Sequence, residues 1–289
     1  MMWIFLIVLS AGLSACQPPA SAPAMSAQTW RADSIPPQIK PSGATVETRF
    51  SPPEGYERLP APAGSFGAYL RQLPLRPDGS PVRLYDGGLK YRQDAHCAVI
   101  DLDPGRRNLQ QCADAAIRLR AEYLFAHRRF SDIHFQFTNG FRADYARWRA
   151  GNRIRVDGKQ VRWTTSGAPD TSRAAFRQYL DMVFAYAGTA SLERELRAAD
   201  LSGIQPGDVW IEGGYPGHAV IVLDVAEQPG TGARCFLLAQ SYMPAQDIHV
   251  LKNPEQPDGN PWYFSHDIDV ELVTPEWTFG RGTLRRWNP

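Results

Sequence analysis

Two residues far apart in the sequence have settings that suit covalent chemistry. Cys112 stands in the first turn of an Ala-rich stretch that predicts a helix, and Asn108 with Gln111 three residues later marks the start of that helix. A helix N-terminus carries about half a positive charge, which favours a thiolate. His218 opens an apolar run that predicts a strand. A thiol nucleophile and an imidazole base within hydrogen-bond reach would together support acyl transfer.

A third group is needed to orient the imidazole, and strand geometry indicates which one. The predicted strands 218–225 and 234–241 are joined by a turn near 229–232, so antiparallel pairing sets His218 roughly opposite Gln240 or Ser241. Asp224 is a poor candidate because six residues along a strand span about 20 Å. Gln240 can accept a hydrogen bond from the ring. The backbone N–H of Cys112 is a candidate oxyanion donor.

The patterning predicts a single α+β domain. Helical periodicity and caps indicate helices over 63–73, 108–124, 143–149, 171–187 and 191–199. Alternating or continuous apolar runs indicate strands over 82–86, 97–102, 133–137, 208–212, 218–225, 234–240, 248–251 and 269–273, with a hairpin over 154–163 that turns at Asp157-Gly158.

The helix that begins near Asn108 is expected to be amphipathic. Its inward face would hold Cys112, Ala116, Leu119 and Tyr123, spaced three or four residues apart. Asp114, Arg118 and Glu122 would form the solvated face. The thiol is therefore expected to point toward whatever the helix packs on.

The Pro206-Gly207-Asp208 turn before one strand and the Gly217-His218 pair at the start of the next resemble papain-like cysteine hydrolases of the NlpC and CHAP type. In those enzymes the nucleophilic cysteine caps a helix that packs on an antiparallel sheet, and the histidine begins a strand of that sheet. The resemblance implies a papain-like core with a helical insertion. It also implies that Cys112 is the nucleophile, His218 the base and Gln240 the orienting group.

Other interpretations of these residues stay open. Cys112 also suits a small core residue, and His218 also suits a histidine bonded to a backbone carbonyl, which would leave an inactive binding domain. His96 and Cys97 are a rival pair, but adjacent strand residues point to opposite faces. A metal site drawn from His96, Cys97, His134 and His218 lacks close-pair ligand spacing, so no metal or other cofactor is expected.

The N-terminus predicts an exported lipoprotein. Residues 1–15 form an apolar run ending in small residues, and Leu13-Ser14-Ala15-Cys16 resembles the bacterial lipobox, which implies cleavage before a lipidated Cys16. Residues 16–46 are rich in Pro, Ala and Ser and predict a disordered tether, so the domain is expected over 47–289. Gln17 favours the outer membrane under the sorting rule for such lipoproteins, with the body in the periplasm.

The cysteine count directs attention to a free thiol. With Cys16 lipidated, Cys97, Cys112 and Cys235 remain, and an odd number leaves at least one unpaired in an oxidising compartment. A disulfide between Cys97 and Cys235 is one option.

The charge balance argues against nucleic acid as a partner. The 31 basic and 30 acidic residues give a net charge of +1, so no long-range field draws polyanions. We expect a monomer whose partners are the membrane, through the lipid, and peptidoglycan or an envelope protein. The segments 64–66, 119–123 and 238–246 resemble a family of bacterial lipoproteins known only as a domain of unknown function, which supplies no activity.

Overall fold

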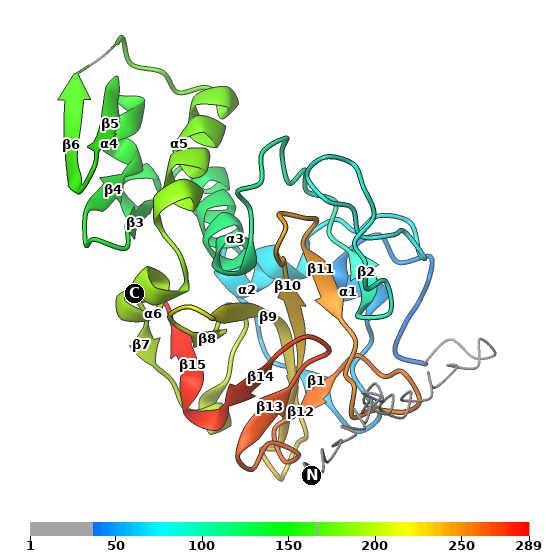
Figure 1. Cartoon of the computed structure of the whole chain (residues 1–289). Helices are drawn as coiled ribbons and strands as arrows, with labels where there is room; N and C mark the ends of the chain where they lie inside the picture. The colour runs from blue at the N-terminus through cyan, green and yellow to red at the C-terminus, as the bar shows by residue number, and fades with distance from the viewer. Residues whose placement is uncertain (1–36, 166, 289) are drawn as a thin grey trace, which may run out of the picture. The chain divides into compact units, whose positions relative to one another are not determined.

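A large antiparallel sheet organises the computed structural model, which describes residues 37–165 and 167–288. The strand order is β2-β11-β10-β9-β8-β15-β7, with β1 also on β9 and β12 also on β10 (Figure 1). Its strands are β1 (Glu57–Arg58), β2 (His96–Val99), β7 (Arg197–Ala198), β8 (Val209–Glu212), β9 (His218–Glu227), β10 (Arg234–Gln240), β11 (His249–Leu251), β12 (Tyr263–Phe264) and β15 (Leu284–Arg286).

Three two-stranded hairpins and a small set of helices complete the described chain. The hairpins are β3 (His134–Gln136) with β4 (Arg142–Asp144), β5 (Asn152–Asp157) with β6 (Gln160–Thr165), and β13 (Glu271–Val273) with β14 (Thr278–Gly280). The helices are α1 (Val46–Arg49), α2 (Phe66–Arg71), α3 (Cys112–Ala126), α4 (Tyr145–Arg149), α5 (Arg173–Tyr186) and α6 (Thr189–Glu195), with 3₁₀ turns η1 (Phe130–Asp132), η2 (Leu201–Gly203) and η3 (Arg281–Thr283). The predicted α+β class is confirmed.

The expected strand over 82–86 is wrong. The segment forms only isolated bridges at Arg83 and Leu84. The side chain of Gln93 accepts a hydrogen bond from the Val82 N–H at 3.0 Å and donates one to the Val82 carbonyl at 2.9 Å. The Gln93 side chain thus bonds both backbone groups of Val82, whose carbonyl also accepts from the Lys90 N–H at 3.0 Å.

The sheet separates two hydrophobic clusters because its side chains alternate between faces. One face carries Ala219, Ile221, Leu237 and Ala239 and packs with α2, α3 and α5. The other carries Val220, Val222, Phe236 and Leu238 and packs with the C-terminal segments around β13, β14 and β15. The long strands β9 and β10 lie side by side between these layers (Figure 1).

A bulge in β9 interrupts this alternation. Leu237 pairs with Asp224 and Leu238 with Val222, so Leu223 has no partner on β10. Such an extra residue reverses the face on which the following side chains lie. His218 shares a face with Val220 and Val222 by ordinary alternation, and the shift in register brings Gln240 of β10 onto that same face.

Helix α3 begins later, and is buried more completely, than its sequence indicates. Its N-cap is Gln111 rather than Asn108, and Cys112 is the first helical residue. Asp114, Arg118 and Glu122, expected in solvent, are each only 5% exposed.

Helix α5 explains the burial of that face. Arg173 on α5 forms a two-pronged ion pair with Glu122, at 2.7 and 3.1 Å, and Arg118 bonds to Glu122 at 2.8 Å. The segment between α3 and β8 therefore covers what would otherwise be the solvated side of α3. Amphipathic spacing could not reveal that layer.

The folded body begins before residue 47, where the composition placed its start. Ile39 bridges to Phe50, and the Thr45 side chain accepts a hydrogen bond from the Thr48 N–H as the N-cap of α1. The expected signal segment, Cys16 and the tether up to residue 36 lie outside the described residues.

A buried carboxylate joins β9 to the N-terminal segments. Asp224 is fully buried and accepts hydrogen bonds from Arg58 Nε at 2.7 Å and Arg71 Nε at 2.6 Å. Arg71 lies on α2 and Arg58 on β1, so one carboxylate fixes two elements against the bulged strand. The position is structural, in keeping with its exclusion from the predicted triad.

We expect Asp224→Ala to destabilise the protein by about 3–5 kcal/mol, because it leaves two guanidinium groups beside the core without a counter-charge. Denaturant titration of the purified chain measures this loss. Asp132→Ala is the matched control, since it removes an exposed partner of Arg129 and should cost below about 1 kcal/mol. Equal costs for the two variants would contradict a special role for Asp224.

Candidate functional site

Cys112 and His218 come together at one cavity. The cavity has a volume of about 330 Å³ and lies between the start of α3, the loop before β9, and the residues that follow β10. Both residues line it, although 106 positions separate them in the sequence numbering. We call this space the thiol cavity.

The start of α3 supplies the nucleophile side of the thiol cavity. Cys112 is the first residue of the helix and is 7% exposed. Asp114 accepts a hydrogen bond from the Gln111 N–H at 2.9 Å. It therefore has the role, three residues after the N-cap, that the sequence assigned to Gln111. The N–H groups of Cys112, Ala113 and Asp114 have no backbone acceptor among the described residues, as expected for a first helical turn.

The residue before His218, Gly217, packs closely against neighbouring parts of the chain and so sets the position of His218. A Cβ added to Gly217 would lie 2.6 Å from Thr189 Oγ1 and 2.7 Å from the carbonyl oxygens of Glu212 and Gly214. Only glycine therefore allows the chain to enter β9 by this route. The following imidazole is fully buried among aromatic rings, those of Tyr242, Trp277 and Phe279, with centroids 4.8 to 5.8 Å away.

Gln240 holds the imidazole, as the sequence predicts. His218 Nε2 lies 2.8 Å from Gln240 Oε1. The register differs from direct opposition: Ala239 pairs with Ile221, so Gln240 reaches His218 diagonally across the face that the bulge gives them in common. Both side chains are fully buried.

Neighbouring charges fix the tautomer of His218. Gln240 Nε2 lies 2.7 Å from Glu276 Oε2, and Glu276 in turn pairs with Lys90 at 2.5 Å. An ionised carboxylate only accepts, so the amide nitrogen must face Glu276 and the amide oxygen must face His218. His218 therefore donates from Nε2 and keeps the lone pair on Nδ1, which has no hydrogen-bond partner among the described residues.

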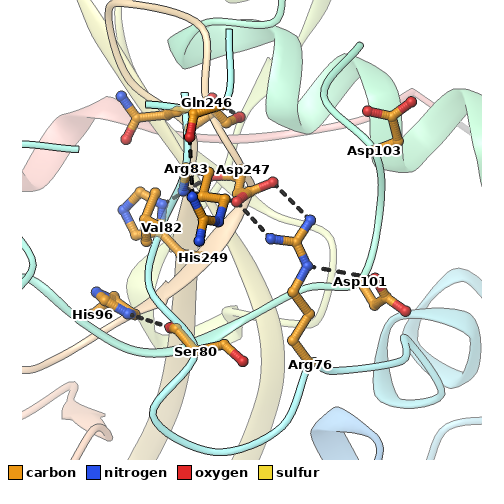
Figure 2. Close-up of polar contacts among 12 residues, drawn as sticks. Arg76, Ser80, Val82, Arg83, His96, Asp101, Asp103, Gln246, Asp247 and His249 are labelled. Atoms are coloured by element: carbon orange, nitrogen blue, oxygen red, sulfur yellow. Dashed lines mark hydrogen bonds and ion pairs between the residues drawn. The ribbon is translucent and has the colours of Figure 1, made fainter. Parts of the chain in front are cut away.

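A second histidine supports the same amide. His249 Nδ1 donates to the Asp247 carbonyl oxygen at 2.9 Å, which leaves its Nε2 to accept from Gln240 Nε2 at 3.4 Å. Figure 2 shows Asp247 held in turn by two hydrogen bonds from Arg76, at 2.7 and 3.0 Å. Glu276, Lys90 and His249 could not be predicted from the sequence, because each lies in a segment without a chemical motif.

The resting electrostatics differ from the thiolate expected at a helix N-terminus. Burial raises the pKa of the Cys112 thiol to about 11, and burial lowers the pKa of His218 to about 4. Burial also holds the pKa of Asp114 well above its usual range. Desolvation thus outweighs the helix dipole, and the thiol cavity at rest is lined by a neutral thiol and a neutral imidazole. No hydrogen bond joins Cys112 Sγ to His218 within the described chain.

The rival sites have structural explanations. His96 Nε2 bonds the Ser80 carbonyl at 3.1 Å (Figure 2), and the Cys97 thiol faces the carbonyl oxygens of Val250 and Leu251. Cys97 and Cys235 are both free thiols, so the optional disulfide is absent. Over residues 37–165 and 167–288 no cluster of three His, Cys, Asp or Glu side chains could hold a metal ion.

Comparison with known families adds a classification. One family model matches residues 46–286, which is most of the chain. The chain belongs to the family described as Domain of unknown function (4846). No curated protein and no solved structure matches it. All residues that line the thiol cavity lie inside the matched region.

The raised pKa of Cys112 predicts a specific alkylation profile. At pH 7 the thiolate fraction is on the order of one in ten thousand, because the pKa lies near 11. The rate of modification by iodoacetamide should therefore rise about tenfold per pH unit above neutrality. Peptide mass spectrometry of the full chain measures the rate for each cysteine separately.

Cys97 is the internal reference for this experiment, since burial raises its pKa to about 12 and it lies outside the thiol cavity. Its modification should lag behind that of Cys112. A Cys112 rate that is already level near pH 7 would instead indicate a preformed thiolate and imidazolium pair.

Proposed function

We propose that the protein is a papain-like cysteine hydrolase that cleaves an amide bond. The observation that supports this most directly is the shared cavity, which both Cys112 and His218 line, with an imidazole whose Nδ1 has no hydrogen-bond partner among the described residues and whose tautomer Gln240 fixes. In a thiol hydrolase the base needs that lone pair on the side of the nucleophile and an acceptor behind its other nitrogen.

The neutral resting pair suggests general-base activation when substrate enters. His218 Nδ1 would take the thiol proton as Cys112 Sγ bonds to the carbonyl carbon. The N–H groups of Cys112 and Ala113 would bind the oxyanion, because they are free at the helix N-terminus. The imidazolium would then pass its proton to the leaving amine nitrogen, and water would hydrolyse the thioester with His218 again as base.

The lining of the thiol cavity favours an uncharged acyl segment. Its walls include Phe184, Tyr215, Tyr242, Met243 and Trp277, and burial holds the pKa of its one acidic side chain, Asp114, well above the usual range, which disfavours the charged form. A peptide amide of the cell wall or of another envelope molecule fits this chemistry. This substrate class follows from the expected envelope location and the resemblance to NlpC and CHAP enzymes.

An inactive binding domain is the second candidate. The buried thiol with a pKa near 11 and the missing hydrogen bond between Cys112 Sγ and His218 favour it. Such a domain would use the same aromatic cavity to hold an envelope partner without covalent chemistry.

Activity measurements on purified cell-wall peptides separate the two candidates. We expect hydrolysis by the wild-type chain, loss of about 10⁴-fold or more in Cys112→Ala, and loss of about 10²–10⁴-fold in His218→Gln because the base is removed. Gln240→Leu should retain more activity than His218→Gln, since it only releases the ring. Mass spectrometry of the released peptides gives the rates.

Cys97→Ala is the matched control, because it removes a thiol that lies outside the thiol cavity and should leave the rate unchanged. Far-ultraviolet circular dichroism checks that each variant folds. Binding of cell-wall peptide by the wild type and by Cys112→Ala with no cleavage product from either would favour the inactive binding domain.

We also propose that lipid on Cys16 holds the protein at the outer membrane with its body in the periplasm. Within residues 37–165 and 167–288, no helix is long and apolar enough to cross a membrane. Cys16→Ser should move the protein from the membrane fraction to the soluble fraction of an expressing bacterium and abolish palmitate labelling. Unchanged membrane association of Cys16→Ser would contradict the anchor.

A further inference from the structure

A second cavity lies beside the C-terminal half of α3. It has a volume of about 310 Å³ and includes Arg120, His134, Glu195 and Trp287 in its lining. None of these residues lines the thiol cavity. We call this second space the arginine cavity.

Arg120 is a cation without an ion-pair partner in the described chain. The other two arginines of the arginine cavity are paired, Arg129 with Asp132 at 2.6 Å and Arg142 with Asp144 at 2.7 Å. Arg120 forms no ion pair and no hydrogen bond with the described residues. A half-buried guanidinium in this state lacks the acceptors that its planar fork normally engages.

Aromatic rings hold Arg120 in place instead. Its guanidinium lies 5.2 Å from the ring of Phe66, 5.5 Å from that of Tyr123 and 5.6 Å from that of Trp287. Cation–π contacts of this kind restrict the side chain but do not use its N–H groups as hydrogen-bond donors, so these can still donate in the plane of the guanidinium. The rings therefore hold the guanidinium in place while its N–H groups stay unengaged by the described residues.

Two further nitrogen atoms of residues in the arginine cavity lack hydrogen-bond partners. The buried indole nitrogen of Trp287 and Nδ1 of His134 have no hydrogen-bond partner among the described residues. An indole N–H can only donate. A smaller cavity of about 170 Å³ is lined by the same Arg120 and Trp287, so these two residues border two concave spaces.

Glu195 does not supply the missing counter-charge. One of its oxygens accepts a hydrogen bond from the Gln136 N–H at 2.9 Å, and the other lies 3.9 Å from His134 Nδ1. Burial raises the pKa of this carboxyl to about 7, so near neutral pH it is partly protonated. A singly charged planar ligand suits this wall better than a phosphate dianion, which Glu195 would repel more strongly.

We propose that the arginine cavity binds a ligand through a carboxylate group, with Arg120 as the fork and the Trp287 indole N–H as a further donor. The ligand class is a small organic acid or a peptide that ends in a free carboxylate. The site uses neither Cys112 nor His218, so it does not depend on the proposed hydrolase activity.

Titration with N-acetylglycine, followed on the indole N–H signals of the ¹⁵N-labelled full chain, tests the site. The eight tryptophans give a small set of signals, and Trp287→Phe assigns the relevant one. We expect a saturable shift of the Trp287 signal with N-acetylglycine and none with the neutral N-acetylglycinamide at equal ionic strength. Inorganic phosphate should bind more weakly than the carboxylate.

Variants then test the role of Arg120. Arg120→Gln should weaken binding about tenfold or more, since a charge-assisted two-pronged contact is lost. Arg120→Lys, which keeps the charge and loses the fork, should fall in between. Arg106→Gln is the charge-matched control, because Arg106 is exposed and lines neither cavity, and it should leave affinity unchanged.

Four results would overturn the proposal: no Trp287 shift up to about 100 mM probe, an equal shift with the amide, tighter binding of phosphate, or unchanged affinity in Arg120→Gln. The wild-type titration with the three probes decides the matter even where a variant fails to fold.

Discussion

The single extra residue in β9 is the constraint on which both the sheet and the candidate site depend. Because Leu223 has no partner on β10, the side chains on the two sides of the bulge follow different alternations. Asp224 therefore meets Arg58 and Arg71 beside α2, while His218, six residues earlier, faces the opposite layer with Gln240. Without the bulge, regular alternation would turn His218 away from the amide that orients it.

The polar network behind His218 allows only one assignment of donors and acceptors. Lys90 pairs with one oxygen of Glu276, the other oxygen accepts from the Gln240 amide nitrogen, and the amide oxygen is left for the imidazole. Each group has one consistent donor and acceptor assignment, which is the condition under which a buried network gives rigidity. The hairpin of β13 and β14 supplies Glu276 from its turn, so the C-terminal region takes part in positioning the site.

Helix α3 connects two cavities with different chemistry. Its first residue, Cys112, lines the thiol cavity, and Arg120, eight residues later and about 12 Å along the axis, lines the arginine cavity. Helix α6 runs between the same two spaces, with Thr189 at the first and Glu195 at the second. The near-complete burial of α3 between the sheet and α5 gives both sites a rigid support.

The sequence by itself determined the local elements and the members of the candidate triad. Apolar periodicity and turn residues predicted α5, the β5–β6 hairpin and the long strands, because these signals are local. Strand pairing also predicted that His218 and Gln240 would meet, since a short turn fixes antiparallel partners to within a residue or two.

Only the tertiary structure decided the rest. The bulge, the burial of Asp114, Arg118 and Glu122, and the partners Glu276, Lys90 and His249 depend on segments distant in sequence, which carry no local signal. The protonation of Cys112 was decided in the same way, because desolvation depends on everything packed around the thiol, whereas the helix dipole depends only on its own turn.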